Sequence, residues 1–237
     1  MKIKILLATI LTVLMLQQAK AQSIKVVYEA QPKIELSGSG LDQSMIEQIK
    51  KNSKLKYQLC YVNGESVCRT LKSESQNSSG NMMINIKTPE DVTYRNHNTN
   101  KEIAYKDFLG KEFLIETELQ AEQWTITDST KMIQGYLCQK AFSHDGKNET
   151  VVWFCANLPI KDGMIYTGLE GLVLELQSDK LNIFAIEISD DADCKIEIPT
   201  KGKKISKDEF DKMVEKRMKA MENEGGGDGK MVIKITR

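Results

Sequence analysis

Histidine is scarce in this sequence, because His97 and His144 are the only two among 237 residues. Nucleophilic catalysis through serine or cysteine normally needs a base within reach, and histidine is the usual one. Both histidines stand in polar, turn-like segments, so we expect both at the surface. The sequence also lacks a G-x-S-x-G elbow, an H-E-x-x-H helix and a glycine-rich phosphate loop. These absences disfavour the common hydrolases, zinc proteases and nucleotide-binding proteins, and no residue is assigned as catalytic.

An excess of positive charge is missing too. The chain has 33 basic and 33 acidic residues, whereas proteins that bind nucleic acid usually carry a basic surplus. The acidic group Asp190, Asp191 and Asp193 lacks the spacing, central glycine and terminal glutamate of a calcium loop. We therefore predict no nucleic-acid partner, no metal site and no cofactor. A pair of carboxylates of the kind glycosidases use stays open, because such pairs converge only in three dimensions.

The longest apolar run lies at the amino terminus. Lys2 and Lys4 precede 12 largely apolar residues from Ile5 to Leu16, and Ala19-Lys20-Ala21 follows. This pattern is typical of a secretory signal peptide with cleavage after Ala21. The run is shorter than the roughly 20 residues of a transmembrane helix, and no later segment is long enough either. We expect a periplasmic or secreted protein whose mature chain, 22–237, has 30 basic against 33 acidic residues.

All five cysteines lie in that mature chain, where an oxidising compartment favours disulfides. They are Cys60, Cys68, Cys138, Cys155 and Cys194. The pairs Cys60–Cys68 and Cys138–Cys155 flank turn-like segments and are the candidate disulfides. A two-residue Asn63-Gly64 turn would place Cys60 opposite Val67, so the first pair needs a bulge or a longer loop. Five is odd, and we expect Cys194, beside three aspartates, to be a free thiol with a raised pKa and no catalytic role.

Short strand-like runs recur about every ten residues between turn signals. They cover residues 24–36, 55–61, 66–71, 82–87, 92–95, 101–107, 111–116, 123–128, 131–143, 149–155, 172–177, 181–188 and 231–236. This spacing predicts a mainly β (α+β) fold with an antiparallel curved sheet or partial barrel. One short helix over 42–51 is predicted by apolar residues at helical spacing behind a capping residue.

A second helix is predicted near the carboxy terminus, over about 206–223. Ser206 and Glu209 form a capping box, and an apolar stripe follows at helical spacing. Its residues are Phe210, Met213, Val214, Met218 and Met221. We expect this helix to cover one side of the sheet, although a methionine-rich face also suits partner docking. A glycine-rich linker, 225–229, precedes the final strand. We expect residues 22–237 to form a single domain.

The segment Gly168 to Val173 reads G-L-E-G-L-V and leads into an alternating run that ends at Leu176. Glycine permits the positive φ of tight turns, so we expect a bend there that feeds a buried strand. Leu169 should point into the core. A ligand-binding loop is the alternative interpretation.

This segment and two upstream ones resemble motifs of a known protein family. Upstream, W-T-I-T begins at Trp124 and G-Y-L-C-Q-K-A begins at Gly135. The chain resembles the GLPGLI family, exported proteins of Gram-negative bacteria with no established biochemical activity. The resemblance implies an exported β-rich domain. Glu170 stands where the family signature has proline, which places a carboxylate at the loop tip and removes a fixed φ.

Aromatic residues gather near the signature. Strand aromatics usually belong to a core, but Trp124, Tyr136, Trp153 and Leu169 could instead line an apolar cavity. The leading hypothesis is therefore a non-enzymatic exported binding protein for an apolar ligand or a cell-envelope partner. The alternatives are an interaction protein without a pocket, which acts in an envelope assembly, and an envelope hydrolase. A structure with either histidine buried beside a serine or cysteine and a carboxylate would overturn this ranking.

Overall fold

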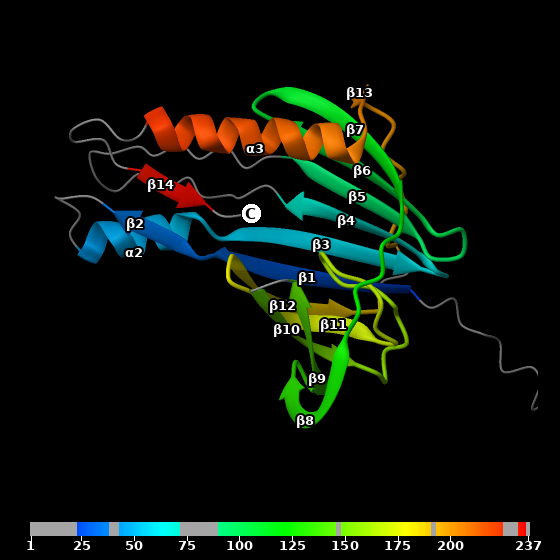
Figure 1. Ribbon diagram of the computed structural model, residues 1–237. Helices are drawn as coiled ribbons and strands as arrows, with labels where there is room; N and C mark the ends of the chain where they lie inside the picture. The colour runs from blue at the N-terminus through cyan, green and yellow to red at the C-terminus, as the bar shows by residue number, and fades with distance from the viewer. Residues whose placement is uncertain are drawn as a thin grey trace, which may run out of the picture.

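The protein is mainly β, as the sequence predicts (Figure 1). The computed structural model describes residues 23–37, 43–71, 90–145, 148–190, 193–224 and 232–235. The predicted signal peptide, the strand over 82–87, the linker 225–229 and Asp191 lie outside these residues. In the part of the chain described, no helix has the length and hydrophobicity needed to span a membrane.

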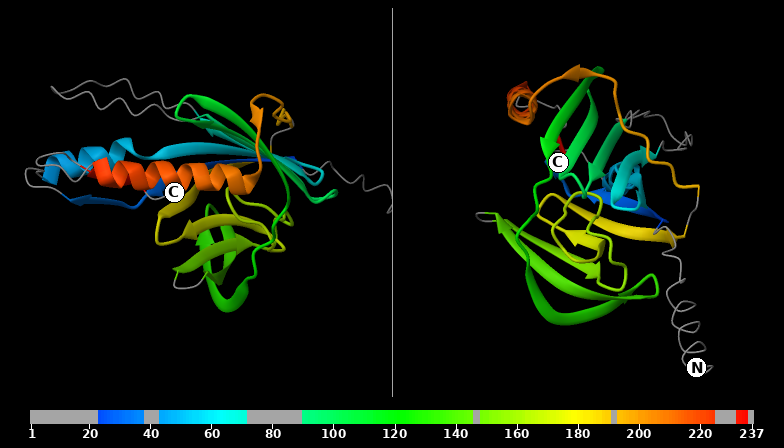
Figure 2. Two further views of the ribbon diagram at one scale, coloured as in Figure 1. Left: turned by 45° about the horizontal axis from the view of Figure 1, so that its top comes forward. Right: turned by 90° about the vertical axis from the view of Figure 1, so that its right-hand side faces the viewer.

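Twelve strands form one sheet in the order β13-β7-β6-β5-β4-β3-β1-β12-β11-β10-β9-β8. The strands from the amino-terminal part are β1 Ser23–Pro32, β3 Leu55–Val62, β4 Glu65–Leu71, β5 Asp91–Asn96, β6 Lys101–Phe108 and β7 Lys111–Glu118. The later ones are β8 Thr125–Ile133, β9 Tyr136–Asp145, β10 Asn148–Cys155, β11 Leu172–Gln177, β12 Leu181–Ser189 and β13 Lys203–Lys204. Neighbours pair antiparallel except β13, which runs parallel to β7. The sheet is strongly curved, and β8 and β9 bend around its lower end (Figure 2).

The β3–β4 hairpin shows how local sequence sets register. Asn63 and Gly64 have φ values of 50° and 87°, which is the geometry a two-residue hairpin turn requires. The turn pairs Val62 with Glu65 and Cys60 with Val67. Because neighbouring residues in a strand point to opposite faces, Cys68 lies on the other face from Cys60, and a Cys60–Cys68 disulfide is ruled out.

Cys60 instead forms a disulfide with Cys194, so the predictions of a Cys60–Cys68 pair and of a free Cys194 are wrong. The segment 193–205 leaves the end of β12 and crosses one face of β3–β7. The disulfide holds its start, Ile196 packs on a small core, and the β13–β7 pairing holds its end. A partner 134 residues away is invisible to local sequence patterns.

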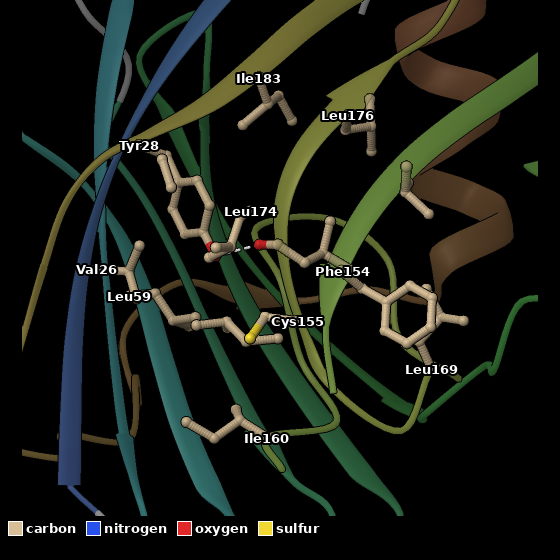
Figure 3. Close-up of a cluster of buried hydrophobic side chains, with 14 of the residues drawn as sticks. Val26, Tyr28, Leu59, Phe154, Cys155, Ile160, Leu169, Leu174, Leu176 and Ile183 are labelled. Atoms are coloured by element: carbon tan, nitrogen blue, oxygen red, sulfur yellow. Dashed lines mark hydrogen bonds between the residues drawn. The ribbon is translucent and has the colours of Figure 1, made fainter. Parts of the chain in front are cut away.

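Two apolar clusters stabilise the sheet. The large first core lies inside the curl, between β1 and β3 on one side and β10 and β11 on the other (Figure 3). Tyr28, Leu59, Leu174 and Ile183 are among its fully or almost fully buried side chains. The small second core is formed on β4–β7 by Val67, Tyr94, Ile103, Tyr105 and Leu114.

Helix α3, Lys207–Glu224, confirms the predicted carboxy-terminal helix and its capping box. The amide and hydroxyl of Ser206 donate to Glu209 Oε2, and the Glu209 amide donates back to Ser206 Oγ. Phe210 packs edge-on against Phe108 and Phe113 of the β6–β7 hairpin. The helix therefore covers β7, while Phe210, Met213, Val214 and Met218 stay only partly buried. Helix α2, Gln43–Asn52, matches the short predicted helix, and β2 Ile34–Ser37 pairs with β14 Val232–Ile235.

Candidate functional site

The most concentrated polar chemistry in the described chain surrounds Asp162. This residue lies in the segment 156–171, which connects β10 to β11 and crosses toward β4 and β5. The β3–β4 turn places Ser66 at the start of β4, and β5 carries Arg95 near its end. His97 follows directly after β5. Side chains from three separate segments of the sequence thus meet at the start of β4 and the end of β5.

The Asp162 carboxylate is fully buried and accepts hydrogen bonds on both oxygens. Arg95 Nη1 donates to Asp162 Oδ1 at 2.8 Å, and the Gly163 amide donates to the same oxygen at 2.7 Å. Ser66 Oγ donates to Asp162 Oδ2, and His97 Nε2 lies 3.2 Å from that oxygen. Ser66 is fully buried, and the His97 side chain is 14% exposed. The carboxylate is therefore satisfied entirely within the protein.

The guanidinium of Arg95 is satisfied in the same way. It donates from Nη1 to the Gly163 carbonyl at 3.0 Å, from Nη2 to the Ile165 carbonyl at 3.1 Å, and from Nε to Glu102 Oε2 at 2.8 Å. Arg95 thus holds the segment 156–171 through the Gly163 and Ile165 carbonyls and the Asp162 carboxylate. Such a planar set of donors is a reason to use arginine rather than lysine at a buried site.

Electrostatics hold this pair in its charged form. Burial alone would raise the pKa of Asp162, but Arg95, His97 and Ser66 outweigh it, and the net pKa is lowered. Burial likewise lowers the pKa of Arg95, yet Asp162 and Glu102 raise it above its usual value. An ionised buried pair with all its hydrogen bonds made is costly to break, because removing one partner strands the other charge.

Serine, histidine and aspartate are present here, but their order differs from that of a catalytic triad. In a triad the serine hydroxyl faces the histidine, and the aspartate holds the far side of the imidazole. Here the hydroxyl of Ser66 and the ring of His97 both face the same oxygen of Asp162. The base is therefore occupied by the carboxylate instead of the hydroxyl. A largely buried histidine beside a serine and a carboxylate, the arrangement that would favour a hydrolase, is thus present, but its Nε2 faces the carboxylate and not the hydroxyl.

The structure corrects the prediction for His97, which is not a surface histidine. No local pattern signals its pairing with Asp162, which lies 65 residues away. His144, by contrast, is more than half exposed on β9, as expected, and Nε2 lies 3.7 Å from Glu149.

The four residues predicted to line a cavity lie around the first core. Leu169 is 3% exposed, and Trp124, Tyr136 and Trp153 pack against that core partly buried. The Trp124 indole donates to the Thr167 carbonyl at 3.1 Å. The structure thus brings the predicted residues to one core, where Trp124 and Leu169 have packing partners.

The G-L-E-G-L-V turn also forms as predicted. Gly168 has φ of 103°, and a Cβ there would lie 2.6 Å from the Glu122 carbonyl oxygen. Gly171 is required for a different reason, because its Cβ would lie 2.5 Å from the Cys155 carbonyl oxygen. Glu170 is exposed at the loop tip and pairs with Lys161 at 2.7 Å. The turn therefore serves close backbone packing.

The three remaining cysteines are free and buried, so the candidate pair Cys138–Cys155 is not a disulfide in this structure. Burial raises the pKa of Cys68 to about 12 and that of Cys138 to about 11. Thiols with such pKa values are almost entirely protonated at neutral pH and are poor nucleophiles.

A polar cleft of about 230 Å³ lies beside the Cys60–Cys194 disulfide. Its walls are charged or polar apart from the disulfide itself, and they come from β1, β3, β4 and the segment 193–197. The lining residues are Lys25, Gln58, Cys60, Arg69, Asp193, Cys194, Lys195 and Glu197. This cleft is neither apolar nor close to the predicted aromatic group.

Comparisons with solved structures agree with the fold. Two structures of PNGF-II, in the P21 and C2 space groups, match with TM-scores of 0.53 and 0.52, each at 15% identity. The matches cover 83% and 82% of this chain but only 34% and 33% of those chains. This chain thus spans about a third of the length of the structures it matches, and at such identity the likeness concerns the fold alone.

No curated protein matches this sequence. A family profile does, over residues 43–215, and its description is "N-glycanase peptide, N-terminal domain". The match includes Ser66, Arg95, His97 and Asp162, as well as the G-L-E-G-L-V turn. Since it covers well over half of the chain, this protein belongs to the PNGase F-II N-terminal domain family.

Proposed function

We propose that this protein is a non-enzymatic, exported binding domain that engages a protein partner at the cell envelope. The observation behind the proposal is that the polar groups around Asp162 already bond to other groups of the protein. A carboxylate that already accepts from Arg95, Ser66 and Gly163 has little capacity left for substrate. Its histidine faces the carboxylate, so a hydrolytic role has weak support.

The packing of the predicted cavity residues favours a partner surface over an enclosed apolar ligand. Trp124 is held by Thr167 and by the edge-on ring of Tyr166, with centroids 5.7 Å apart. The Trp153 ring lies 4.3 Å from Lys131 Nζ, and Leu169 is buried. Side chains with these partners add to the core, and the exposed faces of the sheet are then the natural binding surfaces.

Family membership supports a proposal for where this domain acts. The family is described as the N-terminal domain of an N-glycanase, and the match covers 34% of the PNGF-II chain. We propose that it acts alongside enzymes that process glycoproteins, as a domain that binds a protein. Its resemblance to the exported GLPGLI proteins and its predicted secretory signal support an envelope location.

The test separates binding from catalysis. Purified chain 22–237 is incubated with an N-glycosylated glycoprotein, both native and denatured, and released glycan is measured by mass spectrometry. We expect no release. Turnover that is lost on His97→Ala would overturn the proposal in favour of a hydrolase.

A second arm looks for the partner. Cross-linking in envelope extract, followed by mass spectrometry, should recover one protein reproducibly from chain 22–237. A small molecule that co-purifies with the native protein and leaves on denaturation would instead support the apolar-ligand hypothesis.

A further inference from the structure

Strand β8 is the last strand of the sheet, and among the described residues its outer side pairs with no other strand. An unpaired strand edge presents a row of backbone donors and acceptors that can bind another extended chain. Proteins usually blunt such an edge with charge, proline or a bulge. The part of the β8 edge that lacks such protection is the part where another extended chain could pair.

The amino-terminal half of β8 is blunted by an irregularity. Ile126 pairs with Ala141, but the next pair along the strand is Thr130 with Gln139. Three residues of β8 therefore stand against one of β9, which distorts the edge there. From Thr130 to Ile133 the pairing is regular. This short stretch keeps a regular edge that an added strand could use.

One face of the hairpin is apolar and exposed. Met132 is 62% exposed, and Leu137, directly opposite it on β9, is 53% exposed. Ile126, opposite the buried Ala141, is 53% exposed. Residues directly opposite one another share a face of the sheet. The apolar face that starts at the buried core therefore continues into solvent at the edge.

This face is also uncharged beside the regular stretch. Its polar members, Thr130 and Gln139, carry no charge. Lys131, the charged residue of the stretch, points to the other face, where Nζ lies 2.6 Å from Glu175 Oε2. A partner with charges toward Met132 and Leu137 would lose their hydration without compensation. The face therefore suits a partner whose contacting side chains are uncharged and apolar.

The size of the patch favours a short segment over a second copy of the protein. Three such side chains leave on the order of 300 Å² of apolar surface, the size of a functional patch on a monomer. A stable protein interface buries about 800 Å² on each partner. The patch is too small to be the core of a stable dimer, whereas an added strand gains its remaining affinity from backbone hydrogen bonds.

We propose that β8 accepts an extended segment of a partner protein as an added strand, with apolar side chains at alternate positions over Met132 and Leu137. The inference rests on the proposed function, since it names the partner's binding segment. The binding mode needs only a short uncharged stretch, roughly the length of Thr130–Ile133.

A synthetic peptide tests the edge directly. The probe is an amidated Thr-Val repeat with terminal lysines for solubility, titrated into ¹⁵N-labelled chain 22–237. We expect the largest amide shifts at residues 130–133. Met132→Lys should weaken binding about tenfold or more, because the lysine charge would lose its hydration against the apolar side chains of the peptide. Ile198→Lys, at an exposed apolar residue elsewhere, should bind like the unaltered chain.

A second peptide with alternate amides N-methylated keeps the side chains but removes the backbone donors. Equal binding by both peptides would overturn strand addition, as would shifts that avoid β8. A concentration-dependent dimer that Met132→Lys dissociates would assign the face to a second copy and also overturn the inference. If Met132→Lys still cross-links the envelope partner, the proposed function stands and the edge is not its site.

Discussion

The two halves of the sheet are stabilised by different means. Nineteen of the twenty described residues in the first core come from the curled half, β8–β12 with β1 and β3, and its own loop 156–171 supplies Ile160 and Leu169 among them. The flatter half, β4–β7, has a core of five. Ile196 packs on that small core, and Phe210 packs on the opposite face of the β6–β7 hairpin, so both faces are covered from the end of the chain. One half supplies its own cover, and the other depends on a distant segment.

Asp162 joins these halves. It belongs to the loop of the curled half, while Ser66 and Arg95 belong to the flatter one. The disulfide has the complementary role, because it ties the crossing segment 193–205 to β3. The Asp162 cluster therefore joins regions that share little core, and the disulfide fixes the segment that covers the flatter half.

Asp162→Ala should have the largest effect, a loss of about 3–5 kcal/mol of unfolding free energy, because it leaves Arg95 buried without its partner. Urea unfolding followed by circular dichroism measures it. Lys161→Ala is the matched control, since its neighbouring ion pair with Glu170 is exposed and weak. Similar midpoints for the two variants would contradict the structural importance of the cluster.

Removal of the disulfide with Cys60→Ala and Cys194→Ala should cost about 2–5 kcal/mol, since the bond closes a long loop. Hydrogen exchange should increase first in residues 193–205 and β7, because the flatter half depends on that segment. Cys68→Ala, at a free buried thiol, is the control. Uniform loosening of both halves would argue against their different dependence.

Truncation of a core side chain should reduce the unfolding free energy more in the first core than in the second. Leu174→Ala removes a fully buried side chain of the first core and should cost about 3 kcal/mol. Leu114→Ala, in the small core, should cost about 2–3 kcal/mol, since fewer neighbours surround the cavity. Equal losses in urea unfolding would mean that the small core is packed as completely as the large one.

Gly168→Ala tests the turn that leads into the curled half. It combines a positive φ with a Cβ 2.6 Å from the Glu122 carbonyl oxygen, so we expect a loss of about 2 kcal/mol or more. Gly135→Ala has a similar φ of 82° but open space around the added Cβ, and should lose about 1 kcal/mol. If the two variants unfold alike, backbone crowding at Gly168 has no energetic weight.

Low pH should weaken the contacts of Asp162 that join the two halves, whereas these contacts are complete at neutral pH. The pKa of Asp162 is lower in the folded protein than in the unfolded chain, where it is about 3.9. Its contribution to stability is then complete above that value and is lost as pH falls further. Stability measured from pH 5 to pH 2 should fall less steeply in Asp162→Asn, which lacks this carboxylate. Parallel curves would remove Asp162 from the acid response.

Local patterns in the sequence were enough for most elements. The Asn63-Gly64 turn predicted the pairing of Cys60 with Val67, and Ser206 with Glu209 predicted the start of α3. Turn signals at short intervals predicted a mainly antiparallel sheet. These features depend on backbone preferences and hydrogen bonds within a few residues, so the sequence carries them directly.

The candidate site and the disulfide depend on tertiary structure. The sequence by itself determined a β-rich fold, the glycine-bearing turn before a buried strand, and a capped terminal helix. Only the three-dimensional arrangement decided that Cys60 meets Cys194, that His97 lies beside a buried carboxylate, and that β8 lies at an edge of the sheet where no other described strand pairs with its outer side. Such contacts join residues up to 134 positions apart. Their energy comes from burial and charge pairing across the folded sheet, which no local pattern encodes.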